Sequence, residues 1–241
     1  MNIAITGASK GFGRAIAEKF AMDGRPHIFM LCARNKSNLE KTAEELRSSY
    51  PVSDFRTYSC DLGIKQEAIA FGDWILSQQS HGKQTSAIDV LVNNAGIYLP
   101  GGVHNEEDGV LEKLIAVNLY SAYHLTRRLL PAMMDRRQGH IFNMCSIASL
   151  KAYTNGGSYS ISKFALAGFS KNLREELKPF DIKVTALFPG AAYTDSWKGS
   201  GIDPQRLMDE KDVADMVYSA ARLSPRACVE EIILRPQLGD L

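Results

Sequence analysis

The sequence has almost no surplus of charge of either sign. Its 28 Lys and Arg residues are balanced by 27 Asp and Glu residues, which leaves a formal net charge of +1. Chains that bind nucleic acid normally carry a basic patch, and chains that dock on membrane surfaces carry a basic amphipathic arm. The charge balance therefore favours small molecules as partners over nucleic acid or membranes.

Long hydrophobic runs and cysteine motifs are missing as well. No window approaches the roughly 18 apolar residues of a membrane-spanning helix, and the opening MNIAITGASKG lacks the features of a secretory signal. The four cysteines lack the spacing of a zinc site or of a disulfide scaffold, and they are Cys32, Cys60, Cys145 and Cys228. We expect a cytoplasmic protein without a metal, whose cysteines are small buried hydrophobic residues.

Strand-like and helix-like segments alternate along all 241 residues. Short apolar runs typical of buried parallel strands are separated by segments with helical spacing of apolar residues. The strands are expected at residues 3–6, 27–33, 54–60, 88–92, 139–146, 182–188 and 229–234. This alternation predicts a single α/β domain, residues 1–241, with a Rossmann-like doubly wound parallel sheet of about seven strands and helices on both faces.

A glycine-rich turn, Gly7-Ala-Ser-Lys-Gly11-Phe-Gly13, joins the first expected strand to a helical repeat. Glycines let the backbone approach a pyrophosphate, whose charge is stabilised by the N–H groups and the positive dipole end of the following helix. A tight turn without a ligand would also use glycine, but the strand–turn–helix context favours a dinucleotide. The residues expected to contact it are Gly7, Ser9, Lys10, Gly11, Phe12 and Gly13.

The end of the second strand indicates which dinucleotide binds. An acidic residue there would accept hydrogen bonds from the ribose hydroxyls and repel a phosphate, whereas this chain has Ala33 followed by the cation Arg34. Together with Lys10, Arg34 favours a 2′-phosphate and hence NADP(H); the alternative is that Arg34 is a solvated loop residue. Asp61 and Leu62, after the third strand, are expected at the adenine, although Asp61 is almost as well explained as a helix cap.

Small and amide residues follow the fourth expected strand. Asn94, Ala95 and Gly96 suit a backbone that passes close to a cofactor while its polar groups stay paired. Farther along, Asn118 interrupts the apolar side of a long helical pattern from residue 110 to 134. An amide at such a position predicts either a structural hydrogen bond or a bend that leads water to the active site.

Ser146, Tyr159 and Lys163 form the strongest chemical signal. Tyr159 and Lys163 are four residues apart, so on a helix both side chains project from one face. A nearby cation favours the phenolate, so the pKa of Tyr159, ordinarily about 10, is expected to fall and ease proton transfer. Ser146, at the end of the fifth strand, would donate a hydrogen bond to a substrate oxygen. Taken alone, the three residues fit two interpretations equally well. They could form a reactive group, or Tyr159 and Lys163 could be an ordinary surface pair and Ser146 a loop residue.

The segment from residue 191 to 206 is rich in Gly, Ser and Asp and is expected to be a mobile lid. Trp197 within it could stack on a flat substrate ring, or it could pack the lid shut, which is the commoner use of a lone tryptophan. Together with Ser146 and Tyr159, Tyr153 and Trp197 are the candidates for substrate contact.

The motifs together resemble the short-chain dehydrogenase/reductase family over essentially the whole chain. The matching stretches are Thr6-Gly-x-x-x-Gly-x-Gly13, Asn93-Asn-Ala-Gly96, Asn118, Ser146, Tyr159-x-x-x-Lys163 and Pro189-Gly190 with Thr194. Within the family, bacterial sepiapterin-reductase-type enzymes are similar in three further stretches. These are Pro189-Gly-Ala-Ala-Tyr-Thr194, Trp197 and the ending Val229-Glu-Glu-Ile-Ile-Leu-Arg-Pro236.

The resemblance implies an NADPH-dependent carbonyl reductase. Tyr159 would be the proton donor, Lys163 would lower its pKa and bind the nicotinamide ribose, and Ser146 would polarise the carbonyl. Asn118 would support a water chain to Lys163, and Thr194, after Pro189 and Gly190, would contact the nicotinamide. Family members are commonly dimers or tetramers, so the resemblance also implies a homodimer or homotetramer.

Two alternatives remain open at this point. The same chemistry would serve a 3-oxoacyl thioester, or a sugar or steroid alcohol, in place of a sepiapterin-type ketone. A protein of another class, a non-catalytic NADPH sensor, would bind the cofactor without needing an intact proton donor and its lysine.

Overall fold

The structure, a computed structural model, describes residues 1–80, 83–84, 88–194 and 201–240. Its main sheet has seven strands in the order β3-β2-β1-β6-β7-β8-β9, and neighbouring strands run parallel. The strands are β1 (Asn2–Thr6), β2 (Ile28–Ala33), β3 (Asp54–Ser59), β6 (Val90–Asn93), β7 (Gly139–Met144), β8 (Ile182–Pro189) and β9 (Glu231–Leu234). Strand order reverses between β1 and β6, where a doubly wound sheet places its ligand. The predicted single Rossmann-like domain is confirmed.

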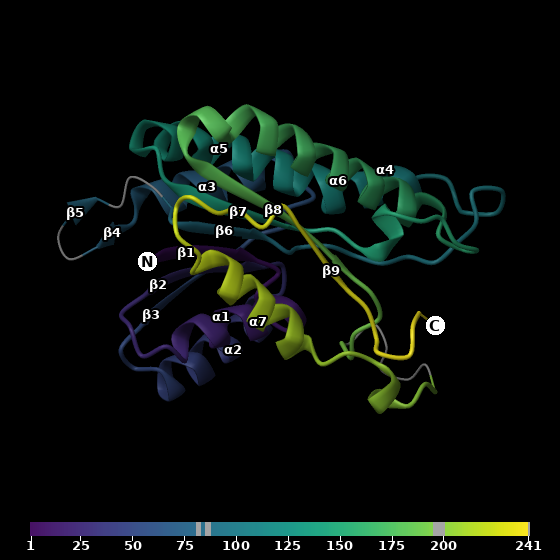
Figure 1. Cartoon of the computed structure of the whole chain (residues 1–241), viewed down its shortest axis with the longest axis horizontal. Helices are drawn as coiled ribbons and strands as arrows, with labels where there is room; N and C mark the ends of the chain where they lie inside the picture. Colours follow the sequence, from purple (N-terminus) through teal and green to yellow (C-terminus); the bar gives the residue numbers. More distant parts are fainter. Residues whose placement is uncertain (81–82, 85–87, 195–200, 241) are drawn as a thin grey trace.

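Helices cover both faces of this sheet (Figure 1). One face packs against α1 (Gly11–Ala21), α2 (Lys36–Ser49) and α7 (Glu210–Ala221). The other packs against α3 (Lys65–Ser77), α5 (Ser121–Arg136) and α6 (Gly157–Leu177). Successive side chains of a strand point to opposite faces, so Ile3 and Ile5 join the first core and Ala4 the second.

The long helical pattern from residue 110 to 134 is three elements rather than one. It consists of α4 (Val110–Ile115), a π-helical turn (Ala116–Tyr120) and α5, and Pro131 lies inside α5, which continues to Arg136. A short antiparallel pair, β4 (Gln79–Ser80) and β5 (Lys83–Gln84), occupies the polar stretch before β6 and was not expected from the sequence.

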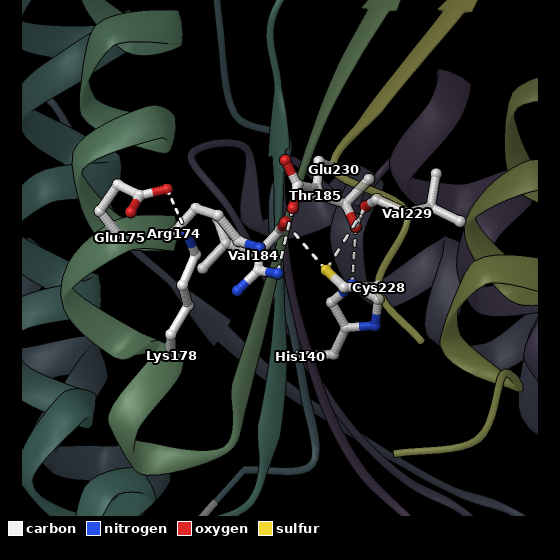
Figure 2. A network of polar contacts seen from close by, with 9 residues as sticks. All are labelled: His140, Arg174, Glu175, Lys178, Val184, Thr185, Cys228, Val229 and Glu230. Carbon is white, nitrogen blue, oxygen red and sulfur yellow. Dashed lines mark hydrogen bonds and ion pairs between the residues drawn. The ribbon is translucent and has the colours of Figure 1, made fainter. Parts of the chain in front are cut away.

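A buried polar network joins β7, β8 and the segment before β9 (Figure 2). The Nε2 atom of His140 lies 2.7 Å from the hydroxyl of Thr185, which donates its own proton to the carbonyl of Val229 at 2.5 Å. Because Thr185 has one proton, His140 must donate from Nε2 and leave Nδ1 unprotonated. Burial, with Lys183 nearby, lowers the pKa of His140 to about 3. The imidazole is therefore a neutral structural group.

Candidate active site

The glycine turn after β1 packs directly against the end of β6. Gly7 and Gly11 have φ angles of 65° and 55°, which favour glycine. A Cβ on Gly13 would lie 2.7 Å from Asn94 Nδ2 and closer still to the Gly7 carbonyl. Asn94 Nδ2 donates to the Thr6 and Gly7 carbonyls at 2.9 and 3.2 Å. The glycine-rich turn, residues 7–13, and the segment after β6, residues 94–96, thus form one rigid unit.

The first turn of α1 has the character of an anion site. Lys10 is its N-cap residue, and its side chain makes no capping hydrogen bond, so the helix presents its N–H groups and positive dipole end at the turn. A Cβ on Gly11 would lie 3.8 Å from the methyl group of Thr194. Lys10, Gly11 and Thr194 also line a cavity of about 510 Å³. The structure therefore brings these three predicted cofactor residues together.

At the end of β2, the Arg34 guanidinium lies 3.7 Å from the Asp61 carboxylate, and the two side chains are 71% and 36% exposed. The alternative that Asp61 caps the next helix is wrong, because α3 begins at Lys65 with Ile64 as its N-cap residue. Asp61 instead accepts the N–H of Gly63 at 2.9 Å and closes a turn. An ion pair this exposed is weak, so the guanidinium group of Arg34 remains available to a phosphate.

Several predicted cofactor residues face the core. Leu62 is buried among the residues beneath α3, and Phe12 packs against the core under α1. The Ser9 carbonyl accepts the hydroxyl of Thr42 at 2.8 Å, which ties the glycine turn to α2. The N–H of Ala95 donates to the Thr6 hydroxyl at 2.8 Å. For Leu62, which is buried, any cofactor contact therefore falls to its backbone groups.

Ser146, Tyr159 and Lys163 converge at the carboxyl end of β7. Ser146 follows β7 and its hydroxyl lies close enough to the Tyr159 phenol to act on its pKa, while Tyr159 and Lys163 lie in the first two turns of α6. The Nζ atom of Lys163 donates to the Met144 carbonyl at 2.7 Å and lies 5.9 Å from the centre of the Tyr159 ring. A Cβ on Gly96 would be 3.5 Å from that nitrogen. The three residues thus lie close together, beside the segment after β6 that contains Gly96.

The pKa of Tyr159 is raised from its ordinary value, because burial disfavours the phenolate and the nearby Ser146 hydroxyl offsets this only in part. The expected lowering by Lys163 is wrong for the chain by itself. Burial also lowers the pKa of Lys163 to about 8, and its ammonium is directed at the Met144 carbonyl. Tyr159 is consequently protonated at neutral pH, which is the state that a proton donor requires.

Asn118 lies in the π-helical turn and is buried. Its Oδ1 accepts the N–H of Ile97 at 2.8 Å, and its Nδ2 donates to the Ile97 carbonyl at 3.1 Å and to the Ser162 hydroxyl at 2.9 Å. Ser162 in turn donates to the Tyr159 carbonyl at 2.7 Å. The structural hydrogen bond that the sequence allowed is therefore present, and it connects the loop after β6 to the turn of α6 that carries Tyr159.

Two further tyrosines stand beside Tyr159. The Tyr98 ring meets the Tyr159 ring edge to face, with centroids 4.9 Å apart and planes at 85°. Burial, with the phenols of Tyr98 and Tyr159 nearby, raises the pKa of Tyr153 well above its ordinary value. Tyr98 and Tyr153 remain 44% and 45% exposed. Tyr153 was a sequence candidate, whereas Tyr98 was missed, although an aromatic residue two positions after Gly96 is a signal that could have found it.

The expected lid is only partly described. Pro189 and Gly190 end β8, where the Gly190 N–H donates to the Leu234 carbonyl at 2.7 Å. Trp197 and the rest of residues 195–200 lie outside the described residues. In the described ranges, no group of three His, Cys, Asp or Glu residues could hold a metal ion. Nor does that part of the chain contain a helix long and apolar enough to cross a bilayer.

A parallel sheet with a glycine turn after its first strand and a Ser–Tyr–Lys group at the carboxyl end of β7, one strand beyond the order reversal, defines the class of dinucleotide-binding oxidoreductases. The sequence profile described as "short chain dehydrogenase" matches residues 1–204. The chain therefore belongs to the short-chain dehydrogenase family.

Similar proteins support this assignment along the whole length. A sepiapterin reductase from Chlorobaculum tepidum is 33% identical over 243 aligned residues, which cover 98% of this chain and 96% of the relative. A metagenomic short-chain oxidoreductase solved in complex with NADP is 30% identical, with a TM-score of 0.82 over 98% of this chain and 97% of its own. A short-chain dehydrogenase from Sphingobium yanoikuyae in complex with NADPH is 26% identical, with a TM-score of 0.80 over 96% and 87% of the two chains.

Proposed function

We propose that this chain is an NADPH-dependent carbonyl reductase in which Tyr159 gives the proton to a ketone oxygen. The observation that carries the proposal is the convergence of Ser146 on a protonated, half-buried Tyr159, with the Lys163 ammonium in the next turn of α6. A non-catalytic NADPH sensor would not need this arrangement. The cofactor-bound relatives support NADP(H) as the partner of the glycine turn.

The residues at the sheet edge fit this cofactor. Side chains in place of Gly7 and Gly13 would clash with neighbouring atoms, so the glycine turn leaves a space that only a residue without a side chain can border. Lys10 and the first turn of α1 are suited to the pyrophosphate. Arg34 would hold the 2′-phosphate and Asp61 the adenine amino group. The other expected contacts are Asn94, Ala95, Gly96, Lys163, Pro189, Gly190 and Thr194. When bound, NADPH supplies the hydride, and the protein supplies position and the proton.

The hydroxyl of Ser146 accepts the N–H of Ala148 at 3.1 Å and keeps its own proton to donate. In a substrate complex this proton would turn from the Tyr159 phenol to the substrate carbonyl, which Ser146 would hold beside that phenol and polarise. Tyr159 would then protonate the developing alkoxide, and the Lys163 ammonium would stabilise the phenolate that is left. Asn118 would hold the loop that follows β6 against α6. It would also support a water chain to Lys163.

We further propose that the substrate is a flat ring with a ketone side chain, of the sepiapterin type. The sepiapterin reductase relative supports this class, and so do the exposed rings of Tyr98 and Tyr153 beside the proton donor, because aromatic faces favour planar partners. Trp197 is the candidate for a second wall, on a lid formed by residues 191–206. The alternative is a 3-oxoacyl thioester or another ketone or alcohol.

Turnover with NADPH decides between these substrates. The purified chain should be tested with sepiapterin, a 3-oxoacyl thioester and simple diketones, and NADPH oxidation followed by absorbance. Reduction of sepiapterin with the highest kcat/KM is expected. Preference for the thioester would move the proposal to the alternative, and tight NADPH binding without turnover on any carbonyl would favour the sensor.

Self-association and a cytoplasmic location complete the proposal. Ile161 and Phe164 lie one turn apart on α6 and are 44% and 45% exposed, and Tyr120, the last residue of the π-helical turn before α5, is 51% exposed. Apolar side chains exposed on adjacent helices suit a homodimer or homotetramer. The four free cysteines suit a reducing compartment. Light scattering of the native chain and of Phe164→Asp tests the assembly, since the variant should lose the α6 contact.

A further inference from the structure

The loop after β6 sends a carboxylate to the start of α6. Glu106 accepts the backbone N–H of Ser158 at 2.8 Å, and its second oxygen accepts the Ser158 hydroxyl. Ser158 is the second residue of α6, is 4% exposed and directly precedes Tyr159. The N-cap residue of α6, Gly156, has no side chain to offer. Glu106, 52 residues away, therefore caps the helix that carries the proton donor.

The surrounding backbone leaves room for this carboxylate and for little else. A Cβ on Gly157 would overlap the carboxylate of Glu106, and a Cβ on Gly101 would lie 2.6 Å from its Cγ. The N–H of Gly101 also donates to the Asn155 carbonyl at 3.2 Å. Two glycines and one backbone bond thus close the loop onto the start of α6 around Glu106.

The same loop carries two other groups of the site. Ile97 holds both ends of the Asn118 amide, and Tyr98 packs edge-on against Tyr159. Glu106 is the point at which this loop returns to α6, one residue before Tyr159. Without the Glu106 carboxylate, the N–H and the buried hydroxyl of Ser158 would lose their acceptor, and the first turn of α6 would be free to shift or fray.

We propose that Glu106 is a positioning residue for Tyr159. Its carboxylate fixes the first turn of α6 against the loop after β6, so that the phenol stays aligned with Ser146. The inference rests on the proposed role of Tyr159 as proton donor. Proton transfer depends steeply on alignment, since misplacement by about 1 Å can lower a rate about 100-fold. The role is therefore expected to appear in kcat more than in binding.

The test compares Glu106→Ala and Glu106→Gln with Glu107→Ala, which removes an exposed neighbouring carboxylate whose side chain makes no hydrogen bond in the described part of the chain. Glu106→Ala should lower kcat about tenfold or more, with KM and the NADPH Kd within about twofold of wild type. Glu106→Gln keeps an acceptor for the Ser158 N–H and can donate to its hydroxyl, so its kcat should stay within about threefold. Glu107→Ala should resemble wild type.

Chemical rescue sharpens the result. Glu106 borders a cavity of about 620 Å³, so formate added to Glu106→Ala can occupy the place of the lost carboxylate and should restore part of kcat, whereas sodium chloride at equal ionic strength should not. If Glu106→Ala fails to fold, Glu106→Asp replaces it, because its shorter side chain cannot reach both Ser158 groups and should lower kcat about tenfold.

Three kinetic results would overturn the inference. They are an unchanged kcat in Glu106→Ala, an equal loss in Glu107→Ala, and a loss that neither glutamine nor formate repairs. A readout without turnover separates this inference from the proposed function. In protein with isotope-labelled tyrosine, the Tyr159 ring signal, assigned with Tyr159→Phe, should shift or broaden in Glu106→Ala and return in Glu106→Gln. An unchanged signal refutes the positioning role even if the wild type reduces no carbonyl.

Discussion

The ammonium of Lys163 donates to the carbonyl oxygen of Met144 at 2.7 Å, at the end of the strand that leads to Ser146. Lys163 is 5% exposed, so its charge is held in the protein interior by a backbone dipole. Burial lowers its pKa from 10.5 to about 8. This residue therefore opposes folding at neutral pH and would be kept for its chemistry.

Lys163→Met should consequently abolish reduction while raising the free energy of unfolding at pH 7. The lowered pKa corresponds to about 3 kcal/mol, and the Met144 carbonyl left without its donor offsets about 1 to 2 kcal/mol, so a net gain of about 1 to 2 kcal/mol is expected. Between pH 8 and 10.5 the unfolded lysine holds its proton more strongly than the folded one. Wild-type stability should thus rise through this window and approach that of the variant, as measured by urea unfolding at several pH values.

Tyr159→Phe removes only the phenolic oxygen. Turnover should fall by a factor of about 10² to 10⁴, the usual contribution of a general acid, while NADPH affinity stays nearly unchanged because the ring still packs against Tyr98. Stopped-flow reduction and a fluorescence titration with NADPH measure the two effects. Tyr218→Phe, which deletes the hydroxyl that donates to Asp23 just after α1, on the opposite face of the sheet from α6, is the matched control. Undiminished reduction by Tyr159→Phe would show that another group gives the proton.

Arg34→Asp tests the cofactor preference. The new carboxylate would stand beside Asp61, whose oxygen is 3.7 Å from the present guanidinium, and two carboxylates at this edge would repel a 2′-phosphate. We expect the ratio of kcat/KM for NADPH over NADH to fall about 10- to 100-fold, as for the loss of one charged contact. Lys41→Asp, on the exposed side of α2, makes the same change of charge away from the strand end and should leave the ratio unaltered.

The sequence predicted the sheet well because its signals are local and repeated. The apolar run at residues 88–92, for example, predicted β6, which spans Val90–Asn93, and the glycines and amides that follow it are required by close backbone contacts. The pairing of Glu106 with Ser158 and the contact of Tyr98 with Tyr159 could not be predicted in the same way. Both depend on how a loop folds back over the sheet, which no local pattern records.

The pKa directions were the least accessible from sequence. The four-residue spacing of Tyr159 and Lys163 indicated correctly that they share a helix face, but it says nothing about burial. In the folded chain burial dominates at both groups and reverses the expected direction for Tyr159. The split of the long helix at Asn118 has a similar origin, since the amide is fixed by Ile97 from a distant loop.

His140 should make the protein sensitive to acid. Its pKa is about 3 in the folded chain and 6.5 when unperturbed, so below pH 6.5 the unfolded state binds a proton that the folded state refuses. Stability should therefore decline as pH falls from 6.5 toward 3, by about 3 to 5 kcal/mol from this residue at the lower end. His140→Gln, which can still donate to Thr185, should flatten this decline in unfolding experiments. His124→Gln, at a less buried histidine on α5, should leave most of it in place.

Tyr98 should set the preference for ring-bearing ketones. Its exposed ring stands beside Tyr159, and an aromatic pair contributes about 0.5 to 1.5 kcal/mol beyond burial. With a phenyl-substituted and an alkyl α-diketone, which share the reacting group, Tyr98→Ala should lower the ratio of kcat/KM values about 2- to 10-fold. Tyr98→Phe keeps the ring and should keep the ratio. If Tyr98→Ala lowers kcat/KM equally for both diketones, the Tyr98 ring only supports Tyr159. The substrate preference then has its origin elsewhere in the pocket.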